Sequence, residues 1–166
     1  NKTGFKLNDL FIGSEGMLGI ITEATLKLIP APPARAGLVA TFPNATQAAK
    51  VVTAVPKAGL LPSALEVADS LTLNAARRYN PSTPDGDAFI LTELDGQEKS
   101  VRGELAQIKK LVKQFSPVSV RTAFGEKEVE TLWDMRRDFS YGLKATGLTK
   151  LNEDVTVPRG RLLDLF

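Results

Sequence analysis

Apolar residues after position 36 form short runs that alternate with longer amphipathic stretches. The short runs favour strands, because apolar segments of this length between turn residues suit a packed sheet. We predict strands at residues 37–42, 63–68, 88–94, 118–123 and 151–157. In the stretches between them, apolar positions recur every three or four residues, which predicts helices. We predict helices at residues 44–55, 71–78, 98–115, 126–145 and 158–163.

This alternation of strands and helices is compatible with two architectures. One is a parallel doubly wound sheet, and the other is a ferredoxin-like antiparallel sheet with helices on one face. No glycine-rich phosphate loop stands at a strand-to-helix turn, which disfavours the nucleotide-binding form of the first architecture. The pattern alone does not choose between the two architectures, and both combine helices with strands.

The first 35 residues have a different pattern. Gly13, Gly16 and Gly19 precede a segment with partial alternation at residues 20–28, which predicts a strand. Glycines before a strand are the reverse order of a P-loop or Rossmann fingerprint. Three prolines within residues 30–33 then form a stiff extended connector. We place a domain boundary there and expect one unit at 1–32 and another at 36–166.

Composition excludes several kinds of chemistry. The chain has 166 residues, a formal charge of +2, no Cys and no His. These absences exclude disulfides, thiolate nucleophiles, Ser-His-Asp catalysis and metal sites that use Cys or His. Acid–base chemistry within the chain would therefore need carboxylates, Lys or Tyr, or else a cofactor.

The charge distribution also bears on partners. Basic residues are dispersed as pairs such as Lys109–Lys110 and Arg77–Arg78, so we expect no nucleic-acid partner. An RNA-binding ferredoxin-like sheet would need exposed aromatic residues, and aromatic residues make up only 7% of the chain. No apolar run approaches the roughly 20 residues of a membrane-spanning helix.

Two segments carry candidate chemistry. The glycines at 13–19 can expose backbone N–H groups to a phosphate or a flavin edge, although spacing alone favours a simple tight loop. On the helix at 126–145, Arg136 shares the inward face of Leu132 and Trp133 and must find an anion. A glutamate of the same chain is the simpler anion, and a substrate acid is the other. Glu66 is a lone acid in an apolar strand.

Residues 9–26, DLFIGSEGMLGIITEATL, begin a series of motifs that continues in the same order along the chain. The later motifs are the proline-rich connector, the strand with Glu66, Leu132-Trp133-x-x-Arg136 on the helix at 126–145, and the turn at 153–162. Together they resemble FAD-linked 2-hydroxyacid dehydrogenases of the vanillyl-alcohol-oxidase type. The relevant branch contains the glycolate oxidase FAD subunit, D-lactate dehydrogenase and D-2-hydroxyglutarate dehydrogenase, and the resemblance covers nearly the whole chain.

The resemblance implies a role for particular residues. It implies that FAD is wrapped by Gly13, Ser14, Glu15, Gly19, Ile20 and Ile21. It implies that Arg136 binds a substrate carboxylate and that Ser140, one turn later, lines the same site. Some relatives have a Lys near Asn152 as a second carboxylate contact, and here the residue is Asn. The family fold implies the antiparallel, ferredoxin-like alternative.

The resemblance also implies what lies elsewhere. Residues 1–32 correspond to the C-terminal piece of an FAD-binding domain of the PCMH type, and 36–166 to part of a cap, or substrate, domain. The phosphate-binding half of the FAD domain is missing, as is the His-rich motif that holds a divalent metal and the catalytic base. We therefore expect a piece of a longer protein, with no catalytic or metal-binding residue of its own. Alone, it should be inactive and bind FAD weakly or not at all.

We accordingly expect an enzyme that oxidises a D-2-hydroxy acid, such as glycolate or D-lactate, by hydride transfer to flavin. The electron acceptor is not indicated, and the enzyme would form a homodimer or join partner subunits of an oxidase complex. It would be cytoplasmic or peripheral to an energy-transducing membrane. The alternative is a stand-alone ferredoxin-like module that binds a small acid or a protein. The apolar residues Phe11, Ile12, Leu18, Ile20 and Ile21 argue against it, because they need a neighbouring sheet to cover them.

Overall fold

The computed structural model describes residues 4–149, 155–158, 161 and 164. The chain divides into two compact units, Asn1–Ala31 and Pro32–Phe166. The first unit contains one short helix, α1 (Asn8–Phe11), and its remaining described residues form turns and extended chain. The assignment of this region to an FAD-binding domain stays a prediction.

The prediction of a strand at residues 20–28 is wrong for this chain. These residues are in no regular element, and Leu26 and Leu28 are 77% and 87% exposed. A strand needs a neighbouring strand to pair its backbone N–H and C=O groups. Among the described residues of the first unit there is no such neighbour, so the alternating pattern has nothing to pair with.

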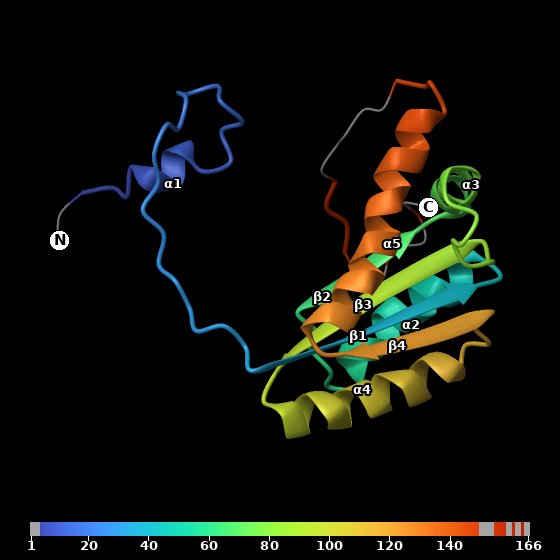
Figure 1. Ribbon diagram of the computed structural model, residues 1–166. Helices are drawn as coiled ribbons and strands as arrows, with labels where there is room; N and C mark the ends of the chain where they lie inside the picture. Colours follow the sequence, from blue (N-terminus) through green and yellow to red (C-terminus); the bar gives the residue numbers. More distant parts are fainter. Residues whose placement is uncertain (1–3, 150–154, 159–160, 162–163, 165–166) are drawn as a thin grey trace. The chain divides into compact units, whose positions relative to one another are not determined.

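The second unit is built on one four-stranded sheet (Figure 1). Its strands are β1 (Ala34–Phe42), β2 (Ala64–Ala68), β3 (Ala88–Gly96) and β4 (Ser119–Phe124). Their order across the sheet is β2-β3-β1-β4, and every neighbouring pair is antiparallel. This is the ferredoxin-like arrangement, so the antiparallel alternative is confirmed and the parallel one is excluded.

One face of the sheet is covered by α2 (Ala45–Lys57) and α4 (Glu98–Lys113) (Figure 1). Side chains alternate along a strand, so Leu38 of β1 and Ile90 of β3 point to this face and pack with Ile108 of α4. The side chain of Asn44 caps α2 by accepting a hydrogen bond from the Gln47 N–H at 3.0 Å. The helix continues past its predicted end, since Pro56 in the last turn interrupts it little.

The other face of the sheet is covered by α3 (Ser70–Tyr79) and α5 (Glu126–Ala145). The α+β class is confirmed, but the expectation of helices on one face only was wrong. The reason lies in the central strands, where residues 36–42 and 88–94 are buried on both faces. Phe89 and Val39 therefore form a second core with Leu132 of α5. The helix α3 occupies the connection between β2 and β3, where the simplest ferredoxin-like fold has a hairpin.

A close backbone contact joins α3 to α5. A Cβ atom at Gly142 of α5 would lie 2.7 Å from the backbone of Ala75 and Ala76 in α3. Only glycine permits this approach, because real Cβ atoms do not come so near to backbone atoms. The contact holds the second half of α5 against the middle of α3.

Two predicted elements fall near the C-terminus. Of the strand predicted at 151–157, residues 151–154 lie outside the described residues, and 155–157 are in no regular element. The helix predicted at 158–163 lies largely outside the described residues. Among the described helices, none has the length and apolar character needed to cross a membrane.

Candidate functional site

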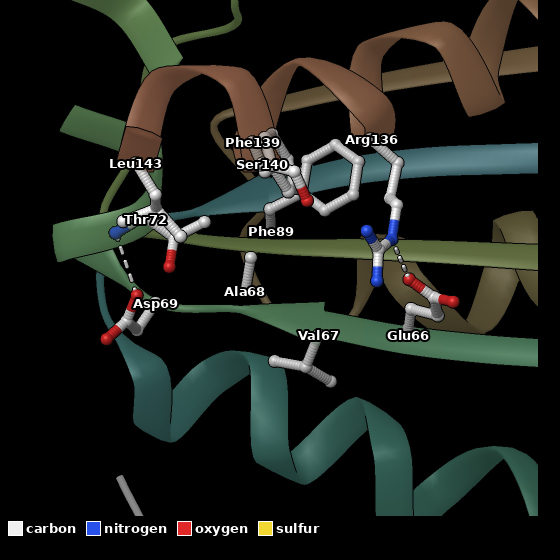
Figure 2. A pocket seen from close by; sticks show the side chains of 10 residues that line it. All are labelled: Glu66, Val67, Ala68, Asp69, Thr72, Phe89, Arg136, Phe139, Ser140 and Leu143. Atoms are coloured by element: carbon white, nitrogen blue, oxygen red, sulfur yellow. Dashed lines mark hydrogen bonds and ion pairs between the residues drawn. The ribbon is translucent and has the colours of Figure 1, made fainter. Parts of the chain in front are cut away.

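A pocket of about 250 Å³ opens between β2, the start of α3 and α5 (Figure 2). The two helices and the strand end meet here because α3 follows β2 directly and packs on α5. Its lining combines charged and hydroxyl groups at the rim with aromatic and aliphatic side chains. The lining residues are Glu66, Val67, Ala68, Asp69, Thr72, Phe89, Arg136, Phe139, Ser140 and Leu143.

Arg136 and Glu66 meet at one end of the pocket. The Nε atom of Arg136 donates a hydrogen bond to Oε2 of Glu66 at 2.6 Å. Their side chains are 40% and 37% exposed, so solvent reaches both. Among the described residues, the two terminal nitrogens of Arg136 have no hydrogen-bond partner. The simpler of the two predicted anions, a glutamate, is therefore present, and the guanidinium keeps donors for a second anion.

The body of the pocket is apolar. Phe89 of β3 and Phe139 of α5 pack edge to face with ring centroids 4.8 Å apart, and both are buried. Ser140, one turn after Arg136 on α5, adds a hydroxyl to the lining. The structure thus brings together the two predicted substrate residues on α5, Arg136 and Ser140, on one wall.

Asp69 provides a second carboxylate in the lining. It is the N-cap of α3 and accepts a hydrogen bond from the Thr72 N–H at 2.9 Å (Figure 2). The partial positive charge at a helix N-terminus offsets part of the charge of Asp69. No role was predicted for Asp69 from the sequence, although an Asp directly before a helix is a recognisable N-cap signal.

A second polar network lies between the sheet and the first half of α5. Arg35 of β1 donates to both carboxylate oxygens of Glu93 of β3, at 2.8 and 3.0 Å. Trp133 Nε1 donates to Oε2 of the same carboxylate at 2.5 Å. Arg35 also pairs with Glu126 and, at 3.5 Å, with Glu130, both on α5. This network fixes the part of the helix that immediately precedes Arg136.

The network changes the acidity of Glu93. Burial alone would raise the pKa of this carboxyl group, but the hydrogen bonds from Arg35 and Trp133 outweigh burial, so its pKa is lowered. The same hydrogen bond from Arg35 to Glu93 raises the pKa of Arg35 above its ordinary value. This network was not predicted from the sequence. The sequence feature that could have indicated it is Glu93, which is a lone acid in the apolar strand at 88–94, as Glu66 is in its own strand.

The residues predicted to hold FAD lie in the first unit. Gly13 and Gly16 have φ of +81°, and Glu15 has φ of +50°, which makes a tight left-handed turn. Added Cβ atoms at the two glycines would meet nothing within 4 Å, so the turn is open to a ligand. Ile20 and Ile21, which follow the turn, are 89% and 65% exposed. Ser14 and Gly19 belong to the same segment.

Other predicted site residues fall outside this description. Asn152 lies outside the described residues, as do the neighbouring acids Glu153 and Asp154. Among the described residues no group of three or more acidic side chains could hold a metal ion. The roles assigned to Arg136, Ser140, Asn152 and the 13–21 segment stay predictions.

Residues 31–166 match the family described as FAD linked oxidases, C-terminal domain. The chain belongs to this family. The resemblance to FAD-linked oxidoreductases is thereby confirmed, and so is FAD as the family's cofactor. The match favours the enzyme hypothesis over a stand-alone binding module.

Individual relatives agree with the family. The chain is 35% identical to the glycolate oxidase subunit GlcD of Bacillus subtilis over 164 residues, covering 98% of the chain and 35% of that protein. It is 30% identical to a probable mitochondrial D-lactate dehydrogenase of Danio rerio, covering 96% of the chain and 32% of that protein. The chain therefore spans about a third of the length of these relatives.

A solved structure agrees with the fold. An alkyldihydroxyacetonephosphate synthase superposes with a TM-score of 0.62 at 19% identity, over 99% of this chain and 36% of that one. At this identity the likeness concerns the fold alone. It supports the α+β assignment made from the sheet order.

Proposed function

We propose that the protein that carries this chain is an FAD-dependent oxidoreductase that oxidises a D-2-hydroxy acid to the 2-oxo acid. Glycolate and D-lactate represent the substrate class. The main observation behind this proposal concerns the two terminal nitrogens of Arg136. They have no hydrogen-bond partner among the described residues, and Arg136 lines a small pocket with an apolar body. The family match and the names of the relatives support the reaction class.

In this proposal Arg136 binds the substrate carboxylate. A guanidinium donates two parallel hydrogen bonds to a carboxylate, which fixes both the position and the orientation of the acid. Glu66 holds the Nε side of the arginine and so limits its rotation. Ser140 offers a hydroxyl to the polar end of the substrate, and Phe89 and Phe139 keep water from the apolar end. Asn152 would be a second polar contact.

We assign FAD binding in the full protein to Gly13, Ser14, Glu15, Gly19, Ile20 and Ile21. The open left-handed turn supports this assignment, because no backbone acceptor among the described residues takes the N–H of Glu15 or Gly16. Such N–H groups suit a phosphate or a flavin edge. When bound, FAD would supply the redox chemistry by accepting a hydride. The residues of this chain orient the substrate and shape the electrostatics of the site. We place the catalytic base outside this chain.

The wider context follows from the same proposal. Residues 1–32 would complete an FAD-binding domain that precedes the cap domain at 36–166. Since the Bacillus subtilis relative is named as a subunit, we propose partner subunits rather than a single chain acting alone. We place the protein in the cytoplasm or at the surface of an energy-transducing membrane. Cell fractionation followed by size-exclusion chromatography of the flavin-containing fraction tests both statements.

The deciding experiment is Arg136→Ala in the full-length protein. We expect KM for the 2-hydroxy acid to rise and kcat/KM to fall by roughly 100-fold, because a charge-assisted, bidentate contact is lost. Arg137→Ala is the matched control. Arg137 is exposed and pairs with Glu130 at 2.7 Å outside the pocket, so this variant should keep kcat/KM within about twofold. Unchanged kinetics in Arg136→Ala would contradict the proposed function.

A further inference from the structure

Three contacts attach α5 to the sheet at intervals of three residues. Trp133 Nε1 donates a hydrogen bond to Oε2 of Glu93 on β3 at 2.5 Å, and Arg136 pairs with a glutamate of β2. Phe139 then packs edge to face on Phe89 of β3. Residues three positions apart are neighbours on a helix surface, so Arg136 lies between the other two contacts. Its place therefore depends on how the turns before and after it are held.

The apolar contacts of α5 fix its distance from the sheet better than its position along the sheet. Val129, Leu132 and Phe139 are buried in the core between the helix and the strands. Apolar burial is non-directional, so a small slide or rotation of the helix disturbs it less than it disturbs a hydrogen bond. A hydrogen bond weakens steeply when its angle is distorted. The bond from Trp133 to Glu93 therefore sets where this turn of α5 lies.

The acceptor of that bond is itself held in place by the sheet. Glu93 accepts hydrogen bonds from Nε and one terminal nitrogen of Arg35 at 2.8 and 3.0 Å. The Glu93 side chain is 11% exposed, so little water competes for these bonds. Arg35 belongs to β1 and Glu93 to β3, which are the two central strands and pair with each other. The indole of Trp133 is thus tied to the most constrained part of the fold.

Arg136 lacks such a support of its own. Among the described residues its hydrogen bond is the one to Glu66, and the two side chains are 40% and 37% exposed. Pairs this open to water contribute little and rearrange easily. Binding a carboxylate through two terminal nitrogens requires both to be correctly placed. A misplacement of about 1 Å in a binding group can cost about 100-fold in rate. The precision must therefore come from the neighbouring turn.

We propose that Glu93 is a positioning residue for substrate binding, which acts through Trp133 on Arg136. It fixes the turn of α5 from which the guanidinium reaches the substrate carboxylate. The inference rests on the proposed function, since it concerns the same substrate contact. It adds to that function two residues, Glu93 and Trp133, that do not line the pocket.

The first test measures kcat and KM for D-lactate with the full-length holoenzyme. Trp133→Phe keeps an aromatic ring and removes the N–H donor. We expect KM to rise by roughly five- to tenfold and kcat to stay within about twofold. The reason is that a misplaced guanidinium weakens binding of the carboxylate equally in the ground state and the transition state.

A stability-matched control separates positioning from a general weakening of the fold. Ile108→Val removes one methyl group from the core beneath α2 and α4, on the opposite face of the sheet, and should cost a similar amount of stability. We expect its KM to stay within about twofold of the wild type. An unchanged KM in Trp133→Phe, or an equal rise in Ile108→Val, would overturn the inference.

A double-mutant cycle tests whether Glu93 acts through Trp133. Glu93→Gln keeps an oxygen acceptor and removes the charge that strengthens its hydrogen bonds, so KM should rise by roughly threefold. When Glu93→Gln is combined with Trp133→Phe, KM should rise no further than in the more affected single variant, because both changes weaken the same link. An unchanged KM in Glu93→Gln, or single effects that multiply in the double variant, would contradict this route.

A structural measurement separates the inference from the proposed function. If the wild type oxidises no 2-hydroxy acid, the proposed function fails, and crystal structures of the full-length wild type and Trp133→Phe still decide the positioning. We expect the guanidinium of Arg136 to be displaced in the variant by about 1 Å or more, on the scale that impairs binding groups. A guanidinium that keeps its wild-type place would refute the role of Glu93.

Discussion

Two arginine–glutamate pairs lie between the sheet and α5, and they differ in how completely the arginine is used. Arg35 binds Glu93 through two nitrogens, and the side chains are 19% and 11% exposed. Arg136 binds Glu66 through one nitrogen, and the side chains are 40% and 37% exposed. The first pair is enclosed by Trp133 and two further acids of α5, whereas the second borders an open pocket.

Ion pairing alone therefore does not distinguish an arginine with a structural role from one proposed to bind a ligand. Arg35 is saturated by carboxylates of its own chain, so it has little capacity for a ligand. Among the described residues, Arg136 retains donors without a partner, and its side chain is accessible to solvent, as a ligand requires. The residues of α5 that contact the two pairs, Trp133 and Arg136, lie on successive turns, so the enclosed pair can hold the helix still while Arg136, in the proposed function, binds the substrate.

The largest expected effect concerns the enclosed pair. Glu93→Ala should lower the free energy of unfolding by about 3 kcal/mol, because it leaves the part-buried Arg35 and the Trp133 N–H without their main acceptor. Urea denaturation of the 166-residue chain measures the loss. The control is Glu98→Ala, whose exposed i,i+4 pair with Arg102 should contribute less than about 0.5 kcal/mol. Equal losses of unfolding free energy in the two variants would contradict the distinction between the enclosed pair and a solvent-exposed pair.

The next effect concerns the half of α5 that carries the pocket. Gly142→Ala should cost about 2 kcal/mol, because the new Cβ would lie 2.7 Å from the backbone of α3 and force the helices apart. Gly103→Ala is the matched control within α4, where an added Cβ meets nothing within 4 Å. That variant should be neutral or stabilise the chain by up to about 1 kcal/mol. Thermal unfolding monitored by circular dichroism compares the two.

A smaller effect is expected when one donor is removed from the enclosed pair. Trp133→Phe keeps an aromatic side chain in the interface and loses the N–H that donates to Glu93 at 2.5 Å. We expect a loss of about 1 kcal/mol in unfolding free energy, since the arginine contacts remain. A loss as large as that of Glu93→Ala would mean that packing of the indole, rather than its hydrogen bond, holds this region.

The enclosed pair also predicts a pH dependence. The pKa of Glu93 is lowered in the folded state from its ordinary value of 4.5, so its ion pair stabilises the fold fully above that value. The contribution is lost as the pH falls through the lowered folded-state pKa, where the carboxylate is protonated. The difference in unfolding free energy between wild type and Glu93→Gln should therefore shrink as the pH is lowered below 4.5. A constant difference would refute this linkage.

The smallest expected effect on stability concerns the open pair. Glu66→Gln should change the unfolding free energy by less than about 1 kcal/mol, because both partners are more than a third exposed and water replaces the lost contact. A loss comparable to that of Glu93→Ala would mean that Glu66 is primarily a structural residue.

The candidate site was only partly predictable from the sequence. Arg136 could be found because its helical spacing put a charge on an apolar face, and Glu66 because it interrupts an apolar strand. The sequence could not join them, since they are 70 positions apart and become neighbours through the packing of α5 on β2. Arg35, at the start of a strand, carried no comparable signal, because its partners come from two distant segments, β3 and α5.

Local sequence patterns were sufficient to predict the helices and strands of residues 37–145, since each element depends on local periodicity and on capping or terminating residues. It also contained the motifs that led to the family. Tertiary structure alone decided the strand order, the covering of both sheet faces and the failure of residues 20–28 to form a strand. Those outcomes depend on which distant segments pair, and pairing is set by burial summed over the whole unit rather than by any local pattern.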